Sequence, residues 1–448
     1  MFASKQQHRH REGSAKSAPF AFPDPTVTVP DTKELRVLNP TSRATVALLA
    51  ALTALGPLAT DMYLPAMPAM REALGTGADQ IQLTLSLYLI GFAMAQLLCG
   101  PLSDRFGRKP VLALGMGVFL LASLVCAFAP NIETLLVARF FQALGGSAGP
   151  VLGRAAVRDI HGPFEASRIL SYMASVMALA PALAPVVGAG LLVWFGWDAI
   201  FLLLALYAAA MLGLIAMMPE PLPLDRRQSI KPSALAVTFR SLLGQRDFVG
   251  YTLANAAAFS GLFAFLSGSS FVLIDYMGVS PDVYGYLFAA IVLGFFIGSL
   301  TSAKLSRRRS RHQLLVAASL IAALGGSAMA LLALAGVHTP WAVIGPHMAY
   351  MIGFGIIMPQ TMGGALAPNP HCAGSASALF GFIQMSIAAG VGALVGQFHD
   401  GTSHSMAIAI GLSGVLALIC YHFIVTDKGS LETLAASAEE SSQGRTST

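Results

Sequence analysis

The residue most able to do chemistry in this chain is an acid inside an apolar segment. Asp61 lies in the stretch LATDMYLP, within the first long apolar run, which begins near Ala44. A carboxylate at membrane depth costs several kcal/mol unless it is neutral, paired or hydrated, so such residues are usually functional. The sequence therefore predicts a functional carboxyl. The alternative is that Pro65 and Pro68 end the helix early and leave Asp61 at a solvated interface.

A cation inside the fourth apolar run could act with this acid. Arg139 lies in the stretch VARFFQ, early in that run. The first and fourth spans run in opposite directions, and at 1.5 Å per residue both charges lie about 10 Å below the same surface. We expect an ion pair or a shared polar network between Asp61 and Arg139. The alternative is a static salt bridge that only fixes helix packing.

A cluster of charges and glycines follows the second apolar run, in the stretch GPLSDRFGRK. Gly100 would let another backbone approach, and Arg108 could bridge Asp104 to Asp159 at the end of the fourth span. Such a cluster could lock a gate, whereas the alternative is a solvated charged turn. The candidate gating residues are Gly100, Asp104, Arg105, Gly107, Arg108 and Asp159.

The fifth apolar run carries the stretch APALAPVVGA, which contains Pro181, Pro185 and Gly188. Ala180, Ala184 and Gly188 form a ridge of small residues on one helix face, which permits close packing. The two prolines should bend the helix. Ordinary small-residue helix packing is the alternative to a functional role for this helix.

Polar side chains inside other apolar runs are candidates for lining a substrate cavity. They are Tyr63, Tyr88, Gln96, Gln142, Asn255, Gln360 and Gln384. The glycines repeated every four residues in the fourth, eighth and eleventh runs favour packing seams over substrate contacts. Asp275 and Asp282 fall in a loop, where we expect them to be solvated.

The amino-acid composition indicates what class of protein holds these residues in place. The 448 residues are 55% hydrophobic and 11% charged, with a mean hydropathy of +0.67. Soluble domains carry roughly 25% charged residues. The apolar runs are long enough for membrane-spanning helices, and backbone groups in lipid must be satisfied within each segment. The sequence therefore predicts an all-α membrane protein.

Several other function classes are disfavoured. The net charge of +5 and pI near 9.1 suggest nucleic-acid binding, but the charges lie between apolar spans. The chain has no GxxxxGK[ST] phosphate loop, which makes ATP an unlikely energy source. It has no Cys/His metal spacing, and its histidines are dispersed, which disfavours a membrane enzyme. We expect no cofactor and no metal.

The spans divide the chain into two sets of six. We expect a cytoplasmic tail at 1–43, a six-helix bundle at 44–218, a cytoplasmic connector at 219–247, a second bundle at 248–426 and a second tail at 427–448. Two sets of six spans around a polar connector indicate a duplicated architecture.

Lysine and arginine positions predict the orientation. Of the 27 Lys and Arg residues, all but Arg71 and Arg139 fall in the tails and in loops on one side, and cytoplasmic loops carry such an excess. We therefore expect a bacterial inner-membrane protein with both termini in the cytoplasm.

The stretch GPLSDRFGRK resembles the loop signature of the major facilitator superfamily, G-x-L-x-D-R-x-G-R-[RK]. A degraded copy follows the eighth span, where Ser302 stands in place of the acid. The fifth-span stretch is similar to the antiporter signature G-x-x-x-G-P-x-x-G-G, matching it at Pro185 and Gly188. The stretch TDMYLPAMP, Arg139 with Gln142, and the RDI that follows the fourth span resemble Bcr/CflA-type drug exporters.

The resemblance covers nearly all of residues 44–426 and implies fold and function. It implies two six-helix bundles around a midplane cavity, and export of chloramphenicol- or bicyclomycin-like drugs in exchange for protons. Asp61 would carry the proton and Arg139 would tune its affinity. Relatives with a second coupling acid carry it where this chain has Thr53. We expect a monomer. The alternative is a dedicated metabolite transporter on the same fold.

Overall fold

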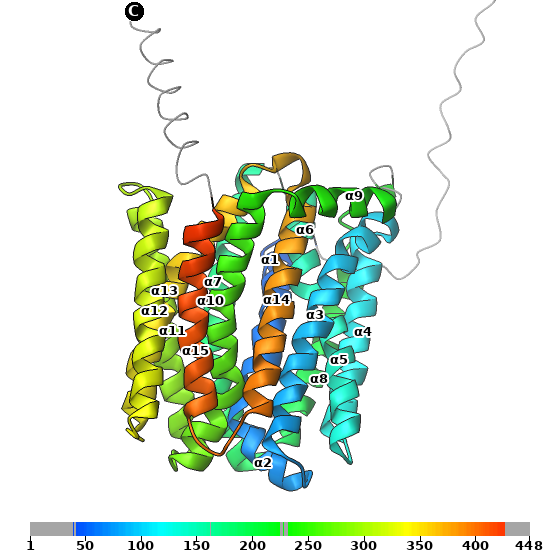
Figure 1. Ribbon diagram of the computed structural model, residues 1–448. Helices are drawn as coiled ribbons and strands as arrows, with labels where there is room; N and C mark the ends of the chain where they lie inside the picture. The colour runs from blue at the N-terminus through cyan, green and yellow to red at the C-terminus, as the bar shows by residue number, and fades with distance from the viewer. Residues whose placement is uncertain (1–38, 40–41, 162, 225–226, 228–231, 426–448) are drawn as a thin grey trace, which may run out of the picture. The chain divides into compact units, whose positions relative to one another are not determined.

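A computed structural model describes residues 39, 42–161, 163–224, 227 and 232–425 (Figure 1). Nearly all of the two predicted tails lies outside the described residues. Within the described part, the secondary structure is helical and contains no strand. Twelve helical segments there are long and apolar enough to cross a membrane. The predicted all-α fold with twelve spans is therefore confirmed.

The first six spans use eight α-helices and one short 3₁₀ turn, because the first and fourth spans are interrupted. Their bounds are α1 (Arg43–Asp61), η1 (Leu64–Ala66), α2 (Met67–Ala73), α3 (Ala78–Phe106), α4 (Arg108–Ala127), α5 (Ile132–Gly146), α6 (Ala148–Ile160), α7 (Pro163–Phe195) and α8 (Asp198–Met217).

The connector contains a helix that the sequence did not predict, α9 (Pro232–Leu243). The last six spans are α10 (Arg246–Ser270) with the π-helical η3 (Phe271–Tyr276), α11 (Pro281–Leu305), α12 (Arg311–Leu334), α13 (Pro340–Leu366), η4 (Pro370–Cys372) with α14 (Ala373–Gln397), and α15 (His404–Ile424).

The first span is longer than predicted. The apolar run that begins near Ala44 predicts a span of about 24 residues, ending near residue 67, but its helical path continues through η1 and α2 to Ala73. The break after Asp61 coincides with Pro65 and Pro68, which lack the N–H that a continuous helix requires. Asp61 therefore lies at the C-terminal end of α1, twelve residues before the span ends.

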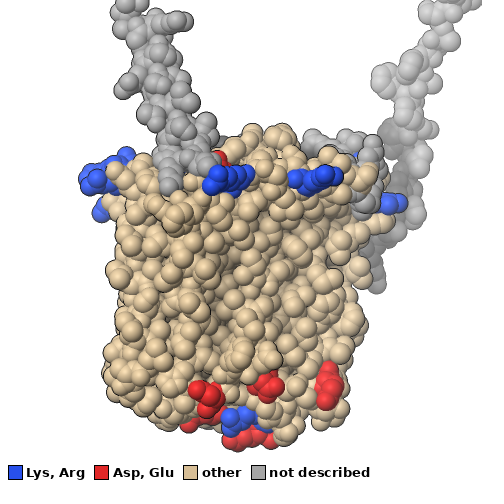
Figure 2. Space-filling view, in the orientation of Figure 1, with Lys and Arg blue, Asp and Glu red and all other residues tan. Residues whose placement is uncertain are grey.

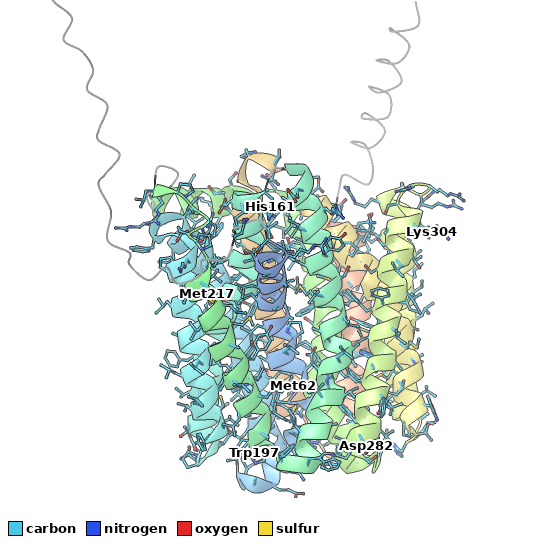
Figure 3. All side chains as sticks on the ribbon, turned by 180° about the vertical axis from the view of Figure 1, so that it is seen from behind. Met62, His161, Trp197, Met217, Asp282 and Lys304 are labelled. Atoms are coloured by element: carbon cyan, nitrogen blue, oxygen red, sulfur yellow. The ribbon has the colours of Figure 1, made fainter. Side chains whose placement is uncertain are left out.

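The two ends of the helix bundle carry opposite charge. Helix α3 has Asp79 in its first turn and Arg105 in its last, and α11 has Asp282 and Lys304 in the same places. Figure 2 shows lysines and arginines gathered at one end and acids at the other. Figure 3 places Lys304 and Asp282 at these opposite ends, which we call the basic end and the acidic end.

Helices α3 and α14 pack together, as do α7 and α11, and these pairs join the first six spans to the last six. Glycines permit the close approach of many helices. An added Cβ at Gly149 of α6 would collide with the Leu52 carbonyl, and one at Gly298 of α11 would collide with the Ile352 carbonyl. The glycine repeats therefore form packing seams, as expected.

Candidate functional site

Asp61 lies buried at the end of α1, in the part of the bundle nearer the acidic end. Figure 3 places its neighbour Met62 closer to Trp197 and Asp282 than to Lys304. The hydroxyl of Thr60 donates to Oδ1 of Asp61 at 2.8 Å. The C-terminal end of a helix carries partial negative charge, so the α1 dipole does not stabilise an ionised carboxylate there.

Arg139 is fully buried on α5 and contacts the α1 backbone two residues before this acid. Its Nη1 donates to the carbonyl oxygen of Ala59 at 3.0 Å and to Oε1 of Gln142 at 2.6 Å. The rings of Tyr63 and Tyr88 each lie 4.4 Å from the guanidinium carbon, in cation–π contact. Nε and Nη2 have no hydrogen-bond partner among the described residues. The arginine is thus held by two aromatic faces, one backbone carbonyl and the Gln142 side chain.

The predicted direct ion pair between Asp61 and Arg139 is absent from this conformation. No such pair within 4.0 Å is present, although both side chains are described. The aromatic rings cover the faces of the guanidinium, and its Nη1 is taken by Ala59, two residues before the acid. The contacts of the two side chains are separate: Asp61 accepts from Thr60, and Arg139 donates to the Ala59 carbonyl and to Gln142.

The predicted cavity residues fall into separate groups. Gln142 bonds Arg139 and donates to the Ser123 hydroxyl at 2.8 Å, so it faces α4. The Tyr63 hydroxyl pairs with Thr84 at 3.1 Å, whereas the Tyr88 hydroxyl is buried without a partner among the described residues. These residues therefore surround Arg139.

The remaining predicted cavity residues lie elsewhere. Asn255 donates to Gln384 at 2.8 Å and accepts from Thr361 at 3.3 Å, entirely within the last six spans. Gln96 of α3 lies against Gly381 of α14, where its Oε1 atom is buried without a partner in the described part of the chain.

Gln360 donates to the hydroxyls of Ser302 and Ser306. Ser302 is the residue that stands in place of the acid in the degraded loop copy. The second half therefore has a neutral hydrogen bond at Ser302, whereas the first half has an ion pair at the corresponding residue, Asp104.

The loop between α3 and α4 forms a three-residue ionic bridge. Nη1 of Arg108 lies 2.6 Å from Oδ1 of Asp104, and its Nε lies 2.7 Å from Oδ2 of Asp159 on α6. The Arg108 side chain is only 10% exposed, so water screens this bridge less than a surface pair. The bridge ties the ends of three helices at the basic end.

The other three gating candidates take no part in the bridge. Arg105 is exposed, with its guanidinium 5.2 Å from the Phe106 ring, and takes no part in the bridge. Gly107 has φ of +102°, a conformation that L side chains rarely adopt. The expected close approach at Gly100 is wrong, because no described atom outside its own helix lies within 4 Å of its Cβ position.

Glu220 also binds the segment between α3 and α4, and the sequence did not indicate this role. It follows α8, and its carboxylate accepts from the backbone N–H groups of Arg108 at 2.7 Å and Lys109 at 3.2 Å. It therefore caps the N-terminus of α4, where an acid is stabilised by the helix dipole. A lone acid after an apolar span gives no local signal of this contact.

The fifth-span motif lies between two other helices. An added Cβ at Gly188 would overlap the Met62 carbonyl oxygen, next to Asp61. The backbone of Pro185 and Val186 faces Gly285 of α11, within 3.1–3.3 Å of its Cβ position. Pro181 lies one turn away on the same continuous helix. The motif therefore touches both the acid-bearing helix and the second half.

The acidic end holds an ion pair between the halves. Nη1 of Arg71 on α2 lies 2.8 Å from Oδ2 of Asp275 in η3. Asp275 is therefore not the freely solvated loop residue that we expected. Arg71 also lies over the Phe271 ring, 5.9 Å from its centroid.

A cavity of about 430 Å³ lies near this pair, between the start of α3 and the end of α14. Its lining includes Asp79 and His399, and none of the predicted cavity residues. Burial lowers the pKa of His399, with Arg71 adding to this and nearby acids opposing it. The hydroxyl of Thr402 holds the pKa of Asp400 below its usual value.

Comparison with known proteins agrees with this architecture. The family model for the Major Facilitator Superfamily matches residues 49–393. The solved D-xylose-proton symporter superposes with a TM-score of 0.69 at 14% identity, covering 86% of this chain and 98% of its own. The chain therefore belongs to the major facilitator superfamily of membrane transporters.

Two curated relatives are similar over most of their length. A Bicyclomycin resistance protein homolog of Haemophilus influenzae is 31% identical, over 85% of this chain and 96% of that protein. A Chloramphenicol resistance protein of Pseudomonas aeruginosa is 33% identical, over 79% of this chain and 83% of that protein. With the twelve spans, these bacterial relatives indicate a multi-pass inner-membrane protein.

Proposed function

We propose that this transporter exports amphipathic drugs, of the chloramphenicol or bicyclomycin kind, in exchange for protons. The observation that carries the proposal is the burial of Asp61 with Thr60 as its hydrogen-bond donor and no cation in ion-pair contact. An ionised carboxylate there would be costly, whereas a protonated carboxyl would not. Such a group can bind and release a proton as its surroundings change.

Arg139 gives this acid a neighbour that can respond to conformation. Its contact with the Ala59 carbonyl couples α5 to the backbone beside Asp61. A rearrangement that freed the guanidinium from Tyr63 and Tyr88 would allow it to approach the carboxylate and displace the proton. Asp61 is the proposed proton carrier, and Arg139 adjusts its proton affinity.

The bridge of Asp104, Arg108 and Asp159 is the proposed gate at the basic end. The packing of Gly188 on Met62 and of Gly285 on Pro185 supports a role for the fifth-span motif in transmitting movement between the halves. We place the basic end and both termini in the cytoplasm, supported by the excess of Lys and Arg. The two sets of six spans act as the moving bundles.

A susceptibility panel tests the proposal. The parent chain and Asp61→Asn are expressed in a pump-deficient bacterial host and challenged with chloramphenicol, bicyclomycin and cationic dyes. We expect the parent to raise the inhibitory concentration of at least one drug and Asp61→Asn to lose that protection at equal membrane abundance. Protection by neither chain would favour a dedicated metabolite transporter.

A further inference from the structure

A buried histidine in the second half occupies the place that Arg139 holds in the first. Arg139 is the eighth residue of α5, and His347 is the eighth residue of α13. Both helices start with the same cap: Asn131 accepts from the N–H three residues later, and so does Thr339. The two caps therefore start both helices at the same number of residues before Arg139 and His347.

Packing further along the two helices confirms this equivalence. Gly145 of α5 would meet the carbonyl oxygen of Gly115 and the backbone nitrogen of Phe119 on α4. Gly353 of α13 would meet the carbonyl oxygen of Ala318 and the backbone nitrogen of Ala322 on α12. Each glycine is six residues beyond Arg139 or His347, and each partner pair has the same position on its own helix. The fourth and tenth spans are therefore matched residue by residue.

The surroundings of His347 resemble those of Arg139 in one respect. The His347 ring is fully buried and stacks on Phe265, with centroids 4.1 Å apart and planes 15° apart. It also stacks on Tyr350, at 5.6 Å and 8°. Both positions thus hold a nitrogen-bearing side chain against two aromatic rings.

The two positions differ in charge compensation. Arg139 donates to the Ala59 carbonyl and to Gln142, whereas Nδ1 and Nε2 of His347 have no partner in the described part of the chain. Helices α12 and α14, which pack against α13, contain no acidic residue. The titratable groups of α12 are Arg311 and His312, which lie in its first turn.

The titratable groups on the other two packed spans are also placed away from the ring. In α10 and η3 they lie near the ends: Arg246, Asp247 and Tyr251 at one end, and Asp275 and Tyr276 at the other. In α11 they are Asp282, Tyr284, Tyr286 and Lys304. Ring contacts connect His347 to Tyr284 through Phe265 and Phe288. None of these groups hydrogen-bonds or ion-pairs with His347.

In the described conformation the Arg71–Asp275 pair joins the two halves at the acidic end and His347 is fully buried, which we call the closed form. This arrangement disfavours a charged ring. An imidazolium there would be a buried cation without a hydrogen-bond acceptor, which costs several kcal/mol. Even the neutral ring leaves a donor and an acceptor unpaired, each costing about 1–3 kcal/mol. Any conformation that lets water reach the ring relieves this cost. His347 therefore disfavours the closed form, and a bound proton would disfavour it more.

We propose that His347 is a second proton-binding site, which takes up a proton when the acidic end opens and must release it before that end closes. The proton comes from the solution at the acidic end, binds the free imidazole nitrogen and later returns to the same solution. It is therefore not a transported proton, and it delays closure in acid. The inference rests on the proposed alternating access, but not on the proton carried by Asp61.

Distance measurements between spin labels test this inference. Labels are placed at Glu133 and Asp282, exposed residues at the acidic end in the two halves, in a background lacking the four native cysteines. Without drug, the open population should rise as the pH falls from 8 to 5, and the rise should begin near the ordinary histidine pKa of about 6.5. His347→Phe should lose this transition while keeping the aromatic stack.

Control variants separate this site from the others. Asp61→Asn should retain the part of the transition that His347→Phe removes, which distinguishes failure of this inference from failure of the proton-exchange proposal. His399→Asn should also retain it. Drug binding by His347→Phe at pH 7.5 establishes that the variant is folded, and His347→Gln should behave like His347→Phe. An unchanged transition in a folded His347→Phe, or its loss in Asp61→Asn or His399→Asn, would overturn the proposal.

Discussion

Arg71 and Asp275 form an ion pair that joins the two halves of the chain, with Nη1 and Oδ2 2.8 Å apart. The pair is about 30% exposed on each side, so it contributes about 0.2–1 kcal/mol to closure. Asp275→Asn should therefore raise the open-to-closed ratio at the acidic end by up to about fivefold.

Labelling by a water-soluble maleimide checks this prediction. A cysteine replaces Ser270, which is buried beside the Met67 sulfur of the other half at 3.6 Å. Its labelling rate should rise in Asp275→Asn, and the exchanged pair Arg71→Asp with Asp275→Arg should restore the slow rate. Equal rates in all variants would show that the ion pair does not hold the end closed.

The Asp104–Arg108–Asp159 bridge predicts a separation of transport from binding. Asp104→Asn removes one charge from a mostly buried arginine, at the basic end and away from the Asp61 site. We expect transport in proteoliposomes to fall at least tenfold, while drug affinity in detergent changes little. Glu133→Gln, an exposed acid at the other end, is the matched control. Parallel loss of affinity and transport would place Asp104 in the binding site.

Gly188 and Gly190 make a matched pair on α7. An added Cβ at Gly188 would overlap the Met62 carbonyl, whereas at Gly190 it would meet no described atom within 4 Å. Gly188→Ala should therefore destabilise the protein by about 1–3 kcal/mol through overpacking. Gly190→Ala should leave it unchanged or slightly more stable, because alanine favours helices. Thermal unfolding in detergent compares them, and equal midpoints would contradict the packing.

His399 predicts a pH dependence of stability. Burial lowers the pKa of His399 in the folded protein below its unfolded value of about 6.5. As the pH falls through that value the unfolded state binds the proton first, so stability decreases until the folded pKa is passed. His399→Gln should flatten the decrease in unfolding midpoint between pH 7 and 5. An identical slope in the variant would assign the dependence to other groups.

Hydropathy alone predicted the spans because lipid leaves the backbone few alternatives to a helix. It could not predict α9, since Pro232 and Arg240 are equally common in an extended linker. Asp104, Arg108 and Asp159 could be predicted to interact because their positions in the sequence place all three at helix ends on the same side of the membrane. Glu220 and Asp275 could not, since their partners Arg108 and Arg71 are distant in sequence.

The depth argument placed Arg139 near the α1 backbone that carries Asp61, but it did not predict which groups Arg139 contacts. Depth fixes position along the membrane normal, whereas the contact depends on which groups surround the guanidinium. Tyr63 and Tyr88 occupy its faces, and Ala59 takes its hydrogen bond. A single sequence gives no information on these tertiary contacts.

Drug-induced proton release from the detergent-solubilised protein tests the central claim most directly. The parent, Asp61→Asn and Asp61→Glu are each mixed with a transported drug in weakly buffered solution containing a pH dye. The account predicts that the parent releases protons, Asp61→Glu releases a reduced amount, and Asp61→Asn releases none while still binding drug. Release from Asp61→Asn equal to that of the parent would contradict the assignment of Asp61 as the proton carrier.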